Sequence, residues 1–150
     1  MGATHFSGPV VSGTLQQAET NGPNQGFAVL SQSTSITQNS TTAVSSTLYI
    51  PAGSRIVDFN IDVLTAYNSA TSATLTIGTA AAGTQYVGSI DAKTAGRAAI
   101  TYTAAQLAAM NGVTVTGTAA ATTPPVVVTV TPVGATSAGY VVVTVLYVQQ

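Results

Sequence analysis

Few side chains in this sequence could carry out acid–base or nucleophilic chemistry. The 150 residues include a single histidine, His5, and no cysteine, so a disulfide or a thiolate metal site is excluded. A Ser-His-Asp arrangement needs a base that is held firmly beside its nucleophile. His5 lies in a segment rich in turn residues, which would hold a catalytic base poorly. We therefore expect His5 to pack beside Phe6 at an interface, with no part in catalysis.

The acidic residues offer a second chemistry, because paired carboxylates hydrolyse glycosides. Asp58 and Asp62 lie four residues apart in an alternating segment. At roughly 3.3 Å per residue, the two would sit about 13 Å apart on one side of a strand. That separation exceeds both geometries that glycosidases use. We therefore expect a solvent-facing acidic strand.

Two segments of the sequence match only part of a known ligand-binding motif. Asp58, Asn60 and Asp62 resemble the start of a calcium loop, but the positions that require glycine and glutamate hold other residues. The glycine spacing from Gly134 to Gly139 resembles a phosphate loop, but the position that requires lysine holds tyrosine. The sequence thus predicts a protein that is not an enzyme and needs no cofactor and no metal.

The surface is predicted to be almost uncharged. Charged residues make up 5% of the chain, with a net charge of −1, against about 25% in ordinary soluble domains. The charged residues are Arg55, Lys93, Arg97, Glu19, Asp58, Asp62 and Asp91. Three basic side chains are too few for a nucleic-acid site or for binding an anionic membrane. A near-neutral surface repels its copies weakly, which favours association with other protein surfaces.

The candidate functional residues lie in two predicted regions, an arm and a β domain. Residues 1–26 hold much Gly and Pro and few large apolar side chains, which predicts an extended N-terminal arm that becomes ordered against another chain. Residues 27–150 are predicted to form one β-sandwich domain of jelly-roll type. Its length is sufficient to bury a hydrophobic core.

The predicted domain contains seven or eight short strands and one helix. The strands are expected at residues 27–37, 43–50, 55–67, 74–77, 85–90, 113–117, 126–131 and 140–149, with residues 132–139 as a loop. Thr103 and Gln106 fit a capping box before a helix over residues 104–110. Turn signals roughly every ten residues, without alternating helices, predict an all-β, antiparallel β-sandwich or jelly roll.

The clearest strand signal lies in residues 55–67. Val57, Phe59, Ile61 and Val63 alternate with the polar Asp58, Asn60 and Asp62. A period of two places the apolar set on the core face and the polar set in water.

Several segments of this β pattern resemble those of a known family. They are THFSGPV (4–10), LYIPAGSRIV (48–57), FNIDV (59–63), ATLTIGT (73–79) and GR (96–97). They are similar to segments of small structural proteins of tailed-bacteriophage virions, above all the head decoration (cement) proteins. The resemblance spans about residues 4–100, and it is a pattern of strands and turns without a diagnostic residue.

The resemblance implies a protein on the capsid exterior of a virion, bound at junctions between capsomers, where it reinforces the shell. Its partners would be the major capsid protein and itself, as a homodimer or homotrimer. The residues expected to contact the capsid or a partner are His5, Phe6, Val10, Val11, Leu15, Arg55 and Arg97. Each arginine is expected either to pair with a carboxylate at an interface or to lie in a solvated turn.

Two other functions stay open at this point. Most of the six tyrosines are expected in the core or at the edges of the sandwich. Tyr49, Tyr67, Tyr86 and Tyr102 fall near predicted strand ends or turns, where tyrosine can also serve an interface or a sugar-binding platform. The chain could therefore be a receptor- or glycan-binding module of a tail fibre or adhesin. A further alternative is another virion structural subunit, from the tail or the connector.

Overall fold

The structure, a computed structural model, describes residues 28–38, 40–51, 54–111 and 125–149. The predicted arm at 1–26 and the predicted strand at 113–117 lie outside the described residues. In chain order the elements are β1 (Val29–Thr37), β2 (Val44–Leu48), β3 (Ser54–Thr65), β4 (Ser72–Gly78), β5 (Val87–Asp91), β6 (Gly96–Arg97), α1 (Ala104–Asn111), β7 (Val126–Val133) and β8 (Tyr140–Gln149).

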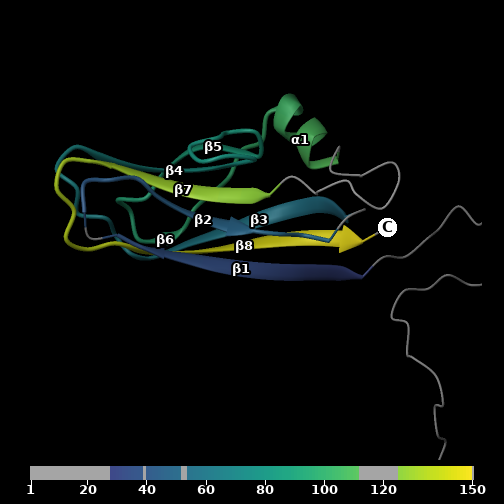
Figure 1. Cartoon of the computed structure of the whole chain (residues 1–150), viewed down its shortest axis with the longest axis horizontal. Helices are drawn as coiled ribbons and strands as arrows, with labels where there is room; N and C mark the ends of the chain where they lie inside the picture. The colour runs from purple at the N-terminus through teal and green to yellow at the C-terminus, as the bar shows by residue number, and fades with distance from the viewer. Residues whose placement is uncertain (1–27, 39, 52–53, 112–124, 150) are drawn as a thin grey trace, which may run out of the picture.

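The strands form two four-stranded sheets that face each other (Figure 1). One sheet has the order β1-β8-β3-β6 and the other the order β2-β7-β4-β5. Every neighbouring pair is antiparallel. For the described residues, the predicted all-β, antiparallel sandwich with one short helix is therefore confirmed.

The core lies between the sheets and is built from alternate residues of the central strands. Val141, Val143 and Val145 of β8 point into it, as do Ile61 and Val63 of β3, and each is at most 2% exposed. Complete burial of such a side chain stabilises the fold by about 1.5–3 kcal/mol. The period-two pattern of the sequence is the direct cause of this layer.

One core assignment from the sequence was wrong. Val57 was expected on the core face, but it is 43% exposed. The register of β3 against β8 shifts between Ile56 and Asp58, which leaves Val57 as an extra residue in a β-bulge. Ile56 takes the buried position, and the alternation expected for Phe59 and the residues after it is unchanged.

Pro132 was expected to begin a loop, but it lies inside β7 opposite Ala73. The ladder between β2 and β7 ends at the pair Val44 and Val130, so β7 has no β2 neighbour at position 132. A proline without an N–H group is tolerated where the strand lacks a neighbour on one side.

The helix α1 begins with the predicted capping box. The backbone N–H of Thr103 donates to Gln106 Oε1 (2.9 Å), and the N–H of Gln106 donates to Thr103 Oγ1 (3.2 Å). These bonds satisfy two N–H groups that the first turn of a helix leaves open. Met110 of α1 is buried in the core.

Candidate binding surfaces

The sequence named seven residues for contact with a partner, and the structure places two of them. His5, Phe6, Val10, Val11 and Leu15 lie outside the described residues. Arg55 lies exposed on β3, opposite Val148 of β8 in the register of the sheet. Arg97 lies on β6 at the edge of the same sheet.

Arg97 is bound by a carboxylate of its own chain. Its Nε donates to Asp62 Oδ1 (2.7 Å) and one terminal nitrogen donates to Asp62 Oδ2 (3.0 Å), which makes a bidentate pair. The hydrogen bond from Arg97 lowers the pKa of the Asp62 carboxyl, and the same bond raises the pKa of the guanidinium. The sequence expected either an interface pair or a solvated turn. The structure instead shows an exposed intrachain pair across two strands.

Asp58 is engaged by a different group. The hydroxyl of Tyr102 donates to Asp58 Oδ1 (2.6 Å), and the backbone N–H of Phe59 donates to the same oxygen (2.8 Å). Burial, followed by the bond to Asp58, raises the pKa of Tyr102. Asp58 and Asp62 thus each have a separate partner. The hydrogen bonds of Tyr102 hold its segment against β3.

Among the described residues, no group of three or more His, Cys, Asp or Glu side chains is close enough to hold a metal ion.

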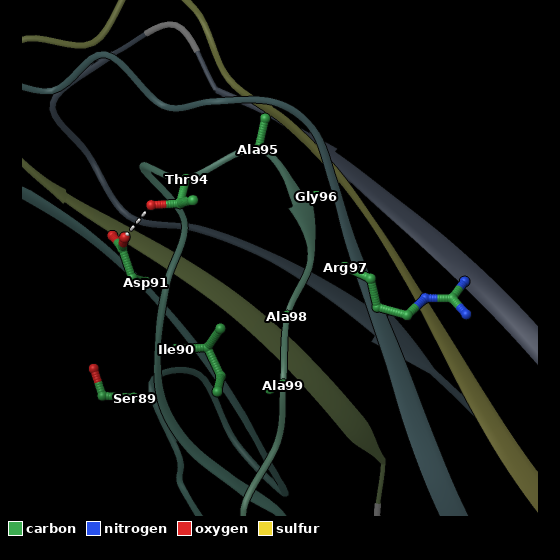
Figure 2. Close-up of a pocket in the computed structure, with 9 residues that line it drawn as sticks. All are labelled: Ser89, Ile90, Asp91, Thr94, Ala95, Gly96, Arg97, Ala98 and Ala99. Carbon is green, nitrogen blue, oxygen red and sulfur yellow. Dashed lines mark hydrogen bonds between the residues drawn. The ribbon is translucent and has the colours of Figure 1, made fainter.

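An open groove of about 460 Å³ runs between β5 and the segment that includes β6 (Figure 2). It is lined by Ser89, Ile90, Asp91, Thr94, Ala95, Gly96, Arg97, Ala98 and Ala99. The guanidinium of Arg97 points away from the groove in Figure 2. The groove wall is therefore made mainly of small side chains and of backbone.

The carboxylate of Asp91 in this groove accepts hydrogen bonds from the turn that follows it. The hydroxyl of Thr94 donates to Asp91 Oδ2 (2.9 Å), and the backbone N–H of Lys93 donates to Asp91 Oδ1 (3.0 Å). These bonds close the turn from β5 to β6, as Asp side chains commonly do. Asp91 therefore has a structural task in the turn.

A second candidate region is one end of the sandwich, which we call the apolar end. Seven large apolar side chains of the described residues are exposed, and five belong to this end: Val29, Leu30, Tyr49, Val57 and Leu107. Figure 1 shows why they share it, because β1 and β3 begin at this end, β2 finishes there and α1 lies beside it. The other two, Leu64 and Val133, lie toward the opposite end.

The sequence partly indicated this surface. Tyr49 was expected near a strand end, and it lies directly after β2 with 70% of its surface exposed. Tyr67 and Tyr86 are buried, as was expected for most of the tyrosines. Val57 was missed because the bulge that exposes it has no sequence signal beyond ordinary alternation.

Comparisons with family models, curated proteins and solved structures found no match to this chain. The resemblance to head decoration proteins therefore stays a prediction. In the part of the chain that the structure describes, no helix is long and apolar enough to span a membrane.

Proposed function

We propose that this chain is a structural, non-enzymatic protein of a tailed-bacteriophage virion that decorates the outer surface of the head. Its partners in this proposal are the major capsid protein and further copies of itself, and it reinforces the shell through protein–protein contacts. The observation that carries the proposal is the apolar end, which is also the end where the chain enters its first strand.

The strand order supports a jelly roll as the specific form of the sandwich. β1 pairs with β8, β2 with β7, β3 with β6 and β4 with β5, all antiparallel. This nesting is the one expected when a long hairpin of eight strands is rolled into two sheets. Jelly rolls are frequent in viral capsid proteins and in lectins, so the fold is compatible with the proposal without deciding it.

The apolar end has the aromatic and apolar side chains of an interface centre, together with the exposed Arg55 of β3, and arginine is a charged residue that interfaces favour. Aromatic and apolar side chains are enriched at the buried centre of interfaces, and charged side chains are depleted there. Tyr49, Val57 and Leu107 supply one aromatic and two aliphatic groups, all exposed. The segment expected to contact the capsid, residues 1–26, precedes β1 by only a few residues and so joins the domain at this end.

A decoration protein need not bind tightly as a single copy. Many copies on one lattice, joined to one another, raise the effective concentration of each contact. A chain with seven charged residues repels its neighbours weakly, which suits dense packing on a shell.

The test is binding of two matched valine variants to expanded capsids that lack this protein. Val57 at the apolar end and Val133 at the opposite end are 43% and 49% exposed, so Val57→Glu and Val133→Glu make the same change on comparable surfaces. Burying Val57 at an interface is worth roughly half of the 1.5–3 kcal/mol for a complete side chain, and burying a carboxylate adds a penalty. Together these predict at least about tenfold weaker binding for Val57→Glu.

Co-sedimentation with the capsids measures this difference. We expect Val133→Glu to bind as the unmodified protein does, and both variants to melt cooperatively. The proposal fails if the unmodified protein does not sediment with capsids, or if both variants bind equally well. Binding to a glycan array without binding to capsids would instead favour the lectin-like alternative.

A further inference from the structure

The strand β1 is the longest free edge in the described part of the chain. It forms the outer strand of its sheet, with β8 hydrogen-bonded on one side and, among the described residues, no strand hydrogen-bonded on the other. It spans nine residues, Val29–Thr37, and its register against β8 runs without a bulge. A free edge of this kind offers a row of unpaired N–H and C=O groups to any second strand.

The alternation of the ladder identifies which backbone groups are free. The N–H of Gln38 donates to the carbonyl of Gly139, so the pair that these residues form is a hydrogen-bonded one. In an antiparallel ladder such pairs alternate with non-bonded pairs. The backbone N–H and C=O groups of the even-numbered residues of β1 therefore point toward β8. The same groups of the odd-numbered residues point away from the sheet. Those residues are Val29, Ser31, Ser33, Ser35 and Thr37, and all five are exposed.

Proteins usually protect such edges, and this chain protects the other side of the sandwich. Charged side chains, prolines and bulges on an edge strand prevent pairing between molecules. On the side formed by β5 and β6 lie Asp91, Lys93 and Arg97, with Asp62 beside them on β3.

In the part of the chain that the structure describes, the β1 side has no such protection. The sequence of β1, VLSQSTSIT, contains no charged residue, no proline and no glycine. The short strand β2 on the same side, VSSTL, is equally uncharged. Four of the seven charged residues therefore lie at or beside the β5–β6 side, and none lies on β1.

We propose that β1 pairs with β1 of a second copy of this chain, antiparallel and about a twofold axis at Ser33. Full overlap of the nine residues places Ser33 opposite Ser33 of the second copy, Ser31 opposite Ser35, and Val29 opposite Thr37. The outward groups of all five odd residues then meet partners and form about ten backbone hydrogen bonds. The two sheets that contain β1 and β8 join into one continuous sheet across the dimer.

The side chains along the proposed β1–β1 contact are small enough for the two strands to pair. Ser31, Ser33 and Ser35 are small, and they lie on the outer face of the sheet, where Ser33 hydrogen-bonds to Thr144 Oγ1 (2.7 Å). The twofold arrangement is isologous, because the same edge serves both copies. The pairing deepens the proposed function by naming the contact between copies. Its test needs no capsid, so it can fail or hold separately from capsid binding.

The experiment is charge reversal at the residue that faces itself, followed by sedimentation velocity of the full chain at low ionic strength. Ser33→Lys or Ser33→Glu places two like charges directly opposite each other, which disfavours pairing. We expect the dimer of either variant to dissociate about tenfold or more readily than the unmodified dimer. A mixture of the two variants places Lys opposite Glu, and we expect it to dimerise at least as well as the unmodified chain.

The matched control is Ser89→Lys, which adds the same charge at an exposed serine on β5, the opposite edge. It should dimerise as the unmodified chain does. The proposal is overturned if the unmodified chain stays monomeric at high concentration, if Ser33→Lys dimerises normally, or if mixing restores nothing. A monomeric chain whose Ser33→Lys variant loses only capsid binding would assign the β1 edge to a strand of the capsid protein.

Discussion

Gly139 lies directly before β8, and its replacement by alanine is expected to destabilise the domain through one contact. A Cβ atom at Gly139 would lie against the ring of Tyr67, at 2.6 Å from Cγ and 2.7 Å from Cε1. The ring cannot move aside easily, because it is 1% exposed and its hydroxyl donates to the carbonyl of Ile36 (3.0 Å). The φ angle of Gly139 is not in the left-handed region, so the backbone itself accepts alanine.

The expected magnitude follows from this overlap. Forcing an additional carbon into a packed core costs about 1–3 kcal/mol. For a chain of this length each kcal/mol lowers the melting temperature by about 2–4 °C. Gly139→Ala should therefore melt about 2–12 °C below the unmodified protein. The assay is thermal and urea denaturation followed by circular dichroism.

Two further variants separate the overlap from other causes. Gly96 has a φ of 126° and nothing within 4 Å of a built Cβ, so Gly96→Ala tests backbone strain without overlap. In a double-mutant cycle with Tyr67→Leu, the smaller side chain should accept the new methyl group. The cost of Gly139→Ala should then fall to a small part of its value in the Tyr67 background. If the two substitutions are additive, the contact with Tyr67 is not the cause, and the reasoning is refuted.

Three further outcomes can be measured. Thr103→Ala removes the oxygen that accepts the N–H of Gln106, and it should lower the free energy of unfolding by about 1 kcal/mol in urea denaturation. Arg97→Gln should raise the pKa of Asp62 toward its usual value in an NMR titration of the carboxyl carbon. Because the pair lowers that pKa, its stabilising effect is present above about pH 4 and is lost as the pH falls through the folded-state value. Burial raises the pKa of Tyr67 to about 12. The folded state thus retains this proton longer than the unfolded state does, so stability should fall between about pH 10 and 12, and less so in Tyr67→Phe.

Local signals in the sequence located most of the strands and the helix. Alternation identified β3 and β8 to within one or two residues at each end, and the capping box identified α1. These signals depend on neighbouring residues only, which is why one chain is sufficient to read them. The two-residue strand β6 was missed, because Gly96 and Arg97 become a strand only through pairing with Asp62 and Val63 far earlier in the chain.

The candidate surfaces were harder to predict for the same reason. The partner of Arg97 lies 35 residues away in sequence, and the partner of Asp58 lies 44 residues away. The exposure of Val57 depends on a bulge relative to β8, which folds against β3 from the far end of the chain. The predicted contacts at 1–26 lie outside the described residues, so they stay predictions.

The adjacency of β1 and β8 has a practical consequence for engineering. Val29 and Val148 are opposite each other in the ladder, so both strands reach the apolar end together. Cargo joined close to either strand end would crowd the face that we expect to dock. The turn between β5 and β6 contains Thr94 and Ala95, both exposed. It lies toward the other end of the sandwich, because β6 pairs with Asp62 and Val63 near the end of β3. A peptide inserted after Ala95 leaves the bond from Thr94 to Asp91 in place, and in the proposed arrangement it would point away from the docked end. We therefore propose this turn for multivalent display of an antigen or an enzyme.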